Sequence, residues 1–178
     1  MSTKIYLNTY TIQQDWDADP IAALDKIKAM GYEGVEMGID YDEVLFNAIK
    51  NKMAELGLAA VSTAAGLDDL IERNEFYFSR MRDLGMKYIF VPWLPEDCLP
   101  GGENYGKTKE KFKYLVAICE NEGIVLSYHN HDFEFKKTGG VCKLDILLQD
   151  IPGLMLELDV CWCMSGAKPG VLYTSLRS

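Results

Sequence analysis

The chain has 178 residues, with 18 basic against 27 acidic side chains and a formal net charge of −9, and at this length we expect one domain, 1–178, with a substantial core. The acidic balance, without a Lys/Arg-rich stretch, repels phosphate backbones and anionic lipid, so no nucleic-acid partner is expected. Five cysteines without C-x-x-C spacing fit a reducing compartment, and no apolar run approaches the roughly 20 residues that cross a bilayer, so we expect a cytoplasmic protein with no membrane partner.

Short apolar runs recur along the chain and predict strands. They begin near Ile5, Gly34, Leu58, Tyr88, Ile124 and Leu154. The segments between them carry apolar residues at helical spacing, as in Leu24, Ile27 and Met30. A glycine ends each helical segment just before the next strand, at Gly31, Gly57, Gly85, Gly123 and Gly153. Asp19-Pro20 marks the start of a helix.

This alternation predicts a parallel sheet covered by helices. No G-x-G-x-x-G or Walker-type loop follows any of the runs, which favours a (β/α) barrel over a nucleotide-binding open sheet. The strand starts are spaced by about 30 residues, and eight such units need roughly 240 residues. The fold class that we predict is therefore α/β, a TIM-type barrel truncated to about six β/α units.

The octapeptide Tyr128–Phe135 contains the chain's two histidines, His129 and His131, at the end of an apolar run. Residues i and i+2 of a strand point to the same side, so both imidazoles can converge on one object. Imidazole suits proton transfer near neutral pH or metal ligation, and we predict a functional site here. The alternative is a pair of hydrogen-bonded loop histidines.

Polar residues also follow the other predicted strands, at the end where a (β/α) barrel carries its chemistry. They include Asn8, Glu36, Glu157 and Asp159. Glu36, the histidines and Asp159 together form a mixture of ligands suited to a divalent cation. Asp159 has an alternative role as the N-cap of the following segment, and Glu36 as the partner of a loop lysine.

The pattern as a whole resembles the sugar phosphate isomerase/epimerase proteins of the xylose isomerase-like barrel superfamily. The residues that carry the resemblance are Leu7–Ile12 with Asp19-Pro20, Gly31–Glu36, the octapeptide, and Leu156–Asp159 with Trp162. The resemblance implies a metal-dependent isomerase, epimerase, dehydratase or lyase that acts on a sugar, keto-sugar or cyclitol. The cation would be Mn, Mg, Co or Zn.

The resemblance also implies roles for single residues. Asp159 matches a metal ligand, and His131 is the expected second ligand, although either histidine fits that position. Glu36 matches a substrate-side acid, and His129 is the expected base. Asn8 and Trp162 are the expected substrate contacts, with the Trp162 indole stacked on a sugar face or, alternatively, packed in the core.

The chain departs from the resemblance after Gly166, where Ala167–Ser178 replaces the last units of a barrel. An open sheet leaves unpaired edges, so we expect self-association and little turnover by the isolated chain. Two further functions compete with the enzyme. One is a non-catalytic sugar-binding or interaction module, and the other, which the net charge disfavours, is an AP-endonuclease-like DNA-repair enzyme.

Overall fold

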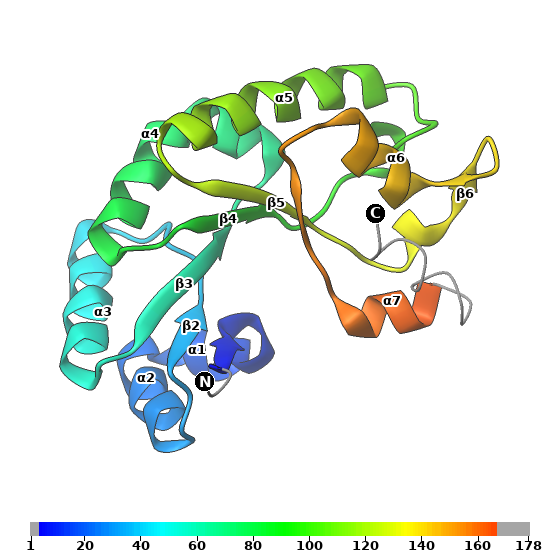
Figure 1. The fold of residues 1–178 in the computed structure, drawn as a ribbon. Coiled ribbons are helices and arrows are strands. Elements are labelled where there is room, and N and C mark those ends of the chain that lie inside the picture. The colour runs from blue at the N-terminus through cyan, green and yellow to red at the C-terminus, as the bar shows by residue number, and fades with distance from the viewer. Residues whose placement is uncertain (1–3, 167–178) are drawn as a thin grey trace. The chain divides into compact units, whose positions relative to one another are not determined.

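The computed structural model describes residues 4–166, and its strands alternate with helices along the chain (Figure 1). Six parallel strands confirm the predicted α/β class, and each begins at or within two residues of its predicted start. They are β1 (Tyr6–Asn8), β2 (Gly34–Glu36), β3 (Ala59–Ala64), β4 (Tyr88–Val91), β5 (Val125–His129) and β8 (Met155–Glu157). The tail Ala167–Ser178, from which we predicted an incomplete barrel, lies outside the described residues.

The helices follow the apolar stripes, with additions that the sequence did not indicate. The α-helices are α1 (Gln13–Ala18), α2 (Pro20–Ala29), α3 (Glu43–Leu56), α4 (Leu67–Leu84), α5 (Tyr105–Asn121), α6 (Lys143–Asp150) and α7 (Val160–Gly166). Short 3-10 turns are η1 (Thr9–Ile12), η2 (Glu96–Cys98) and η3 (Phe133–Phe135). A small antiparallel hairpin joins β6 (Lys137–Thr138) to β7 (Val141–Cys142). Within residues 4–166, no helix has the length and apolar character to cross a membrane.

The chain groups into two compact units. The first comprises Met1–Ala64 and Arg73–Tyr88, and the second comprises Ala65–Glu72 and Ile89–Ser178. The chain passes from one unit to the other within α4, where Arg73 departs from helical geometry with φ −124° and ψ 25°.

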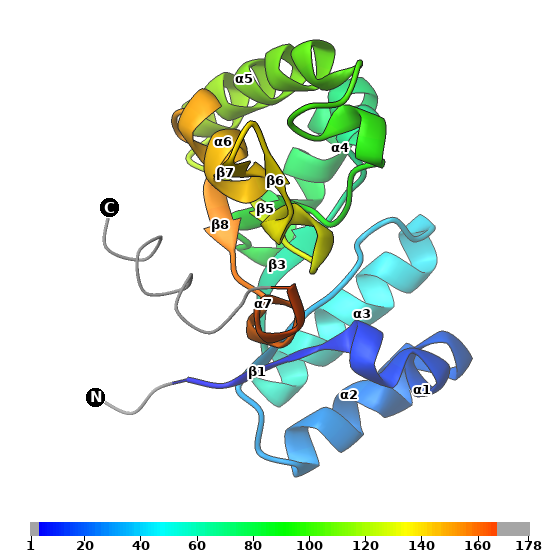
Figure 2. The ribbon, with the colours of Figure 1, turned by 90° about the vertical axis from the view of Figure 1, so that its right-hand side faces the viewer.

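In the first unit the strands follow the order β1-β2-β3, and α2 and α3 lie side by side (Figures 1 and 2). The apolar stripes of these helices are buried, including Leu24 and Ile27 of α2 and Ile49 of α3. Gly34 allows β2 to approach β3 closely, because a Cβ at this position would lie 2.3 Å from the carbonyl oxygen of Ala59. Gly34 pairs with Ala59 and Val35 with Ala60, and a register shift between Val35 and Glu36 then places Glu36 opposite Ser62.

The segment that follows β2 is anchored by two arginines of α4. The buried Arg80 guanidinium donates through Nη1 to the carbonyl oxygens of Ile39 and Tyr41, each at 2.7 Å. Arg73 forms a two-pronged ion pair with Asp40 at 2.7 and 2.9 Å, and this hydrogen bonding lowers the pKa of the Asp40 carboxyl. The backbone just beyond Glu36 is therefore held in one conformation by α4.

In the second unit the strands follow the order β4-β5-β8, with the β6–β7 hairpin beside α6 (Figure 2). The pairing of β5 with β8 sets Ser127 opposite Met155 and His129 opposite Glu157. The core includes Phe112 and Leu115 of α5 and Leu147 of α6, each fully buried.

The predicted helix boundaries are confirmed. The glycines expected to end helices, namely Gly31, Gly57, Gly85, Gly123 and Gly153, all have positive φ. At the start of α2, the Asp19 side chain accepts a hydrogen bond from the Ala22 backbone N–H at 3.0 Å, and Pro20 occupies the first helical position.

Candidate functional site

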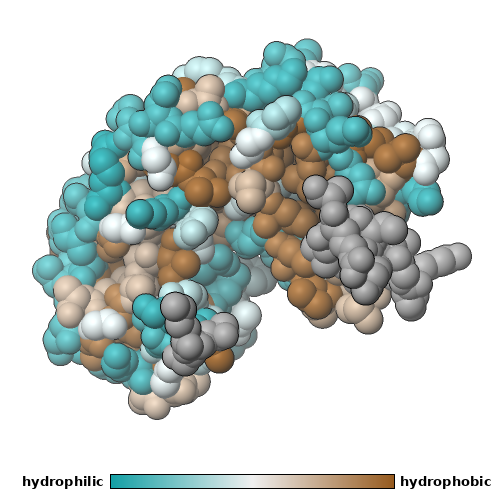
Figure 3. All heavy atoms as spheres, viewed as in Figure 1, coloured by the Kyte–Doolittle hydropathy of each residue, from teal (hydrophilic) through white to brown (hydrophobic). Residues whose placement is uncertain are grey.

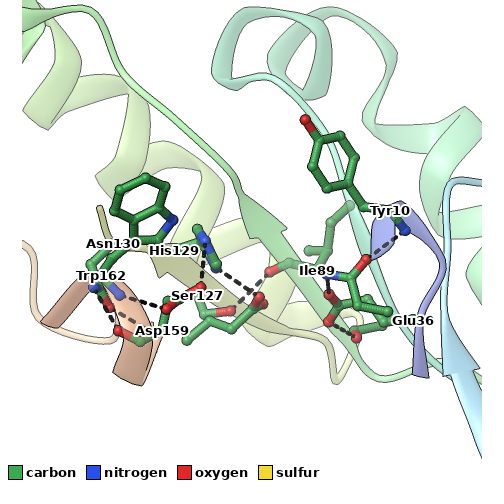
Figure 4. Close-up of polar contacts among 11 residues, drawn as sticks. Tyr10, Glu36, Ile89, Ser127, His129, Asn130, Asp159 and Trp162 are labelled. Carbon is green, nitrogen blue, oxygen red and sulfur yellow. Dashed lines mark hydrogen bonds and ion pairs between the residues drawn. The ribbon is translucent and has the colours of Figure 1, made fainter. Parts of the chain in front are cut away.

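Glu36 is the centre of a polar cluster in the first unit, at the ends of its three strands. Its Oε1 accepts a hydrogen bond from Asn8 Nδ2 at 2.7 Å, and its Oε2 accepts one from the Ser62 hydroxyl at 2.5 Å (Figure 4). Strand register explains the cluster, because Asn8 pairs with Glu36 across β1–β2 and Glu36 pairs with Ser62 across β2–β3. Both oxygens thus accept hydrogen bonds from neutral groups, which fixes the orientation of the carboxylate.

Asn8 has a second role in the same cluster. Its Oδ1 accepts the Tyr10 backbone N–H at 2.8 Å and caps the turn η1, while its Nδ2 is directed at Glu36. The amide orientation is therefore determined by the backbone on one side and by the carboxylate on the other. An Asn in this position presents Glu36 in a fixed geometry rather than as a mobile side chain.

His129 is the centre of a second cluster, which lies in the second unit. Its Nδ1 is 3.1 Å from Glu157 Oε1, and its Nε2 is 3.8 Å from Asp159 Oδ2. The ring of Phe90 packs beside the imidazole, with 5.9 Å between the ring centroids. The 3.1 Å contact is a hydrogen bond in which Nδ1–H donates to the carboxylate, whereas 3.8 Å is longer than a hydrogen bond. Nε2 of the neutral ring is then the nitrogen with a lone pair.

His131 belongs to the second cluster and lies there among aromatic rings. Its ring stacks on Phe133 at 5.3 Å with an interplanar angle of 6°, and it lies 5.4 Å from the Trp162 ring. The ring is also 5.2 Å from that of His129, edge to face. Its Nδ1 is buried and, within the described part of the chain, has no hydrogen-bond partner. The side chain of His131 is thus positioned by ring packing.

Asp159 caps α7 and contributes to the second cluster at the same time. Its Oδ1 accepts the Trp162 backbone N–H at 2.8 Å, so the alternative role as an N-cap is confirmed. The buried Asn130 side chain binds the Asp159 backbone in both directions, donating to its carbonyl oxygen at 3.2 Å and accepting its N–H at 2.9 Å (Figure 4). This pair of bonds holds Oδ2 of Asp159 on the side of His129.

The fit of these side chains to a divalent cation can be judged from the donor set. Among residues 4–166, no group of three or more His, Cys, Asp or Glu side chains is placed to hold a metal ion. Of the two predicted ligands, Asp159 caps a helix and His131 is packed between aromatic rings with Nδ1 buried. The described residues therefore do not form a preorganised metal site, and the ligand roles of His131 and Asp159 stay predictions.

The predicted residues thus fall into two groups. Asn8 and Glu36 form one cluster in the first unit, and His129, His131, Asp159 and Trp162 form another in the second. The catalytic, substrate-binding and metal roles assigned to these residues stay predictions, and so does the convergence of the two clusters.

Two buried residues of the second cluster were missed by sequence reasoning. Asn130 and Glu134 are both fully buried, although each reads as an ordinary polar loop residue in the sequence. The signal that identifies Asn130 is alternation, because on a strand that presents His129 and His131 to one side, residue 130 faces the other. No comparable pattern identifies Glu134, which follows the strand.

Comparisons with known proteins find similarity only among solved structures. The chain matches no protein-family model and no curated protein. Among solved structures, it is similar to two sugar phosphate isomerase/epimerases from Parabacteroides distasonis ATCC 8503. One is 23% identical with a TM-score of 0.75, and the match covers 99% of this chain and 72% of that one. The other is 22% identical with a TM-score of 0.80, and the match covers 98% and 75%.

A third match extends the similarity beyond that species. It is a xylose isomerase domain-containing protein from Salmonella typhimurium LT2, 14% identical with a TM-score of 0.59, and the match covers 88% of this chain and 59% of that one. The predicted fold is confirmed by these matches. The chain has the fold of xylose isomerase-like barrel proteins, and its described residues form six parallel strands of such a barrel.

Proposed function

We propose that the chain contributes to a sugar isomerase or epimerase that moves a proton at a carbon next to a carbonyl group. The substrate would be a sugar, keto-sugar or cyclitol. The observation that carries the proposal is the environment of His129, with Glu157 at Nδ1 and Asp159 near Nε2. Similarity to solved sugar phosphate isomerase/epimerases supports the carbohydrate class.

His129 is the proposed base. Its Nδ1–H donates to Glu157, which orients the ring, and Nε2 is the nitrogen proposed to remove a proton from carbon. The imidazolium that forms is stabilised by the Glu157 and Asp159 carboxylates on its two sides.

Glu36 is the proposed second acid–base group, held by Asn8 and Ser62. A proton that is removed from a carbon and returned to its opposite face inverts that carbon, which is epimerisation. A proton returned to the neighbouring carbon of an enediol gives isomerisation. Asn8 is the proposed contact for a substrate hydroxyl. The indole of Trp162, whose residue is 39% exposed, is the proposed stacking face for a sugar ring.

No step of this mechanism passes through a cation, because the described residues do not supply a set of three ligands. Metal dependence, which the family resemblance implies, belongs to the proposal and is tested in the same assay. Rates would be compared after chelation and after addition of Mn²⁺, Mg²⁺, Co²⁺ or Zn²⁺. A rate that falls on chelation and returns with one of these ions would show that a cation takes part in the reaction.

The proposal is tested by following exchange of substrate C–H for deuterium in D₂O by proton NMR, with long incubations because little turnover is expected of the isolated chain. The substrates would be a panel of ketoses, keto-glycosides and cyclitol ketones. His129→Gln should lower the exchange rate by at least about 100-fold, the ordinary contribution of a general base. Glu157→Gln should lower it less, and Glu120→Gln, an exposed carboxylate of α5, should leave it unchanged. Exchange by His129→Gln at the parental rate would rule out this base.

A sugar-binding module without chemistry is the second candidate. It is favoured by the stacked rings of His131 and Phe133 beside the partly exposed Trp162, which form an apolar wall suited to carbohydrate. A thermal shift with a sugar, lost in Trp162→Ala, together with no exchange in any substrate, would favour this module over the enzyme.

A further inference from the structure

The segment from Tyr128 to His131 alternates between two environments. Tyr128 and Asn130 are fully buried, whereas His129 and His131 are partly exposed. This is the alternation of an extended strand, continued past the last residue of β5. The two imidazoles are therefore held by whatever fixes the buried residues behind them.

Glu134 lies behind this segment as a fully buried carboxylate. Its Oε1 accepts the Tyr128 hydroxyl at 2.5 Å, and its Oε2 accepts the His131 backbone N–H at 2.8 Å. One side chain thus binds the residue before His129 and the residue two after it. Both donors are neutral, and both carboxylate oxygens are occupied.

We infer that Glu134 is a positioning residue that sets the orientation of the His129 ring by closing a loop from Tyr128 to His131. The inference rests on the proposed function only in giving His129 a reaction to perform. Glu134 does not act on the substrate itself, because its carboxylate is buried and both oxygens are in use. It acts on the backbone that carries the base.

Burial of a carboxylate is costly unless its hydrogen bonds are specific and complete. Burial and the Glu134 charge raise the pKa of Tyr128, so the phenol stays protonated and keeps donating throughout the neutral range. An apolar residue at 134 would fill the space without binding either end of the loop. The carboxylate therefore fixes a geometry that packing alone does not specify.

The test uses the fact that the chain contains two histidines. Protein labelled with ¹⁵N and ¹³C at histidine gives two imidazole spin systems, whose chemical shifts and contacts to Phe90 and Phe133 in NOE spectra report where each ring lies. The variant is Glu134→Gln, which keeps the shape but presents an N–H₂ group to one of the two donors. Tyr128→Phe removes the hydrogen bond from the Tyr128 hydroxyl to Glu134 while leaving Glu134 in place. It is the second variant, to be used if Glu134→Gln folds poorly.

In both variants we expect the His129 ring resonances to move. Glu134→Gln should also speed hydrogen exchange of the His131 amide by at least tenfold. In the deuterium-exchange assay, kcat should fall about tenfold with KM nearly unchanged, because the base is misplaced and substrate binding is not. Leu147→Ala is the control, since it opens a cavity in α6 without removing a bond to Glu134.

The inference is overturned if the His129 resonances are the same in Glu134→Gln and Tyr128→Phe as in the parent. It is also overturned if Leu147→Ala moves them equally, because the effect is then general loosening. Displaced resonances in a protein without turnover would contradict the proposed function and leave the positioning role standing. Turnover that Glu134→Gln leaves unchanged would contradict the positioning role and leave the proposed function standing.

Discussion

Among single residues, the neighbours Ser62 and Thr63 on β3 differ in whether their hydroxyl groups are hydrogen-bonded. The Ser62 hydroxyl donates to Glu36, whereas Thr63 Oγ1 is buried and, among the described residues, has no hydrogen-bond partner. An unsatisfied buried hydroxyl is destabilising relative to a methyl group of the same shape. Thr63→Val should therefore raise the free energy of unfolding by about 1 kcal/mol, measured by urea denaturation. Ser62→Ala is the comparison and should lower it; a loss of stability in Thr63→Val would contradict the prediction.

The cysteines provide a second prediction at this scale, based on pKa. Burial raises the pKa of Cys119 to about 12, and it also raises the pKa of Cys142 and Cys163, whereas Cys161 is exposed. Because the thiolate is the reactive form, iodoacetamide at pH 8 should modify Cys161 first and Cys119 only after unfolding. Mass spectrometry of partially alkylated protein measures the order. Cys161→Ser should remove the fast reaction, and rapid modification of folded Cys119 would contradict its burial.

The raised pKa of Cys119 has a consequence for stability. The folded state favours the protonated thiol, so this contribution is fully present below the ordinary thiol pKa of 9.0 and is lost as the pH rises through about 12. Alkaline solutions should therefore destabilise the second unit by this route, while neutral and mildly basic solutions should not.

At the scale of elements, Asp159 links a helix start to the candidate site. Asp159→Ala should lower the free energy of unfolding by about 1 kcal/mol, because the cap of α7 is lost. Asp159→Asn keeps the cap oxygen and should leave stability nearly unchanged, but it removes the charge near His129 and should slow deuterium exchange. Asp42 caps α3 through the Leu45 N–H in the same way, so Asp42→Asn is the matched control. Equal exchange rates in the two Asn variants would contradict a role for the Asp159 charge.

The elements also show what the sequence could predict. The strands and long helices could be predicted because each has a local sequence pattern. A strand is marked by a short apolar run, and a helix by an amphipathic stripe that ends at a glycine. The helix α7 and the β6–β7 hairpin were not, because Cys161-Trp162-Cys163-Met164 has no polar face and two-residue strands have no period. The bonds of Glu36 depend on a register shift between Val35 and Glu36, which arises from strand pairing rather than from any local pattern.

At the scale of the whole molecule, the order of β/α units was predictable and the grouping into two units was not. The chain changes unit within α4, a segment whose departure from helical geometry at Arg73 has no glycine or proline to mark it. Chemistry at the strand ends was predictable as residue types, since polar side chains there are unexpected in an apolar strand. The buried supports Asn130 and Glu134 were not, because only the folded chain reveals their burial.

Self-association is the prediction that belongs to the whole chain. In the described residues β8 pairs with β5 alone, and hydrophobic side chains gather over the β8–α7 segment (Figure 3). Met155 of β8 and Val160 and Met164 of α7 are 56%, 61% and 65% exposed, and exposed apolar side chains of this kind are typical of a contact surface.

The average mass measured by analytical ultracentrifugation should therefore rise with concentration. Val160→Lys combined with Met164→Lys should weaken association by at least about tenfold, because each apolar side chain removed from a contact costs 1 kcal/mol or more. Val44→Lys is the matched control, since Val44 is 82% exposed on α3 of the first unit. A mass that does not change with dilution, or a Val44→Lys effect equal to that of the double variant, would show that the β8–α7 surface is not the contact.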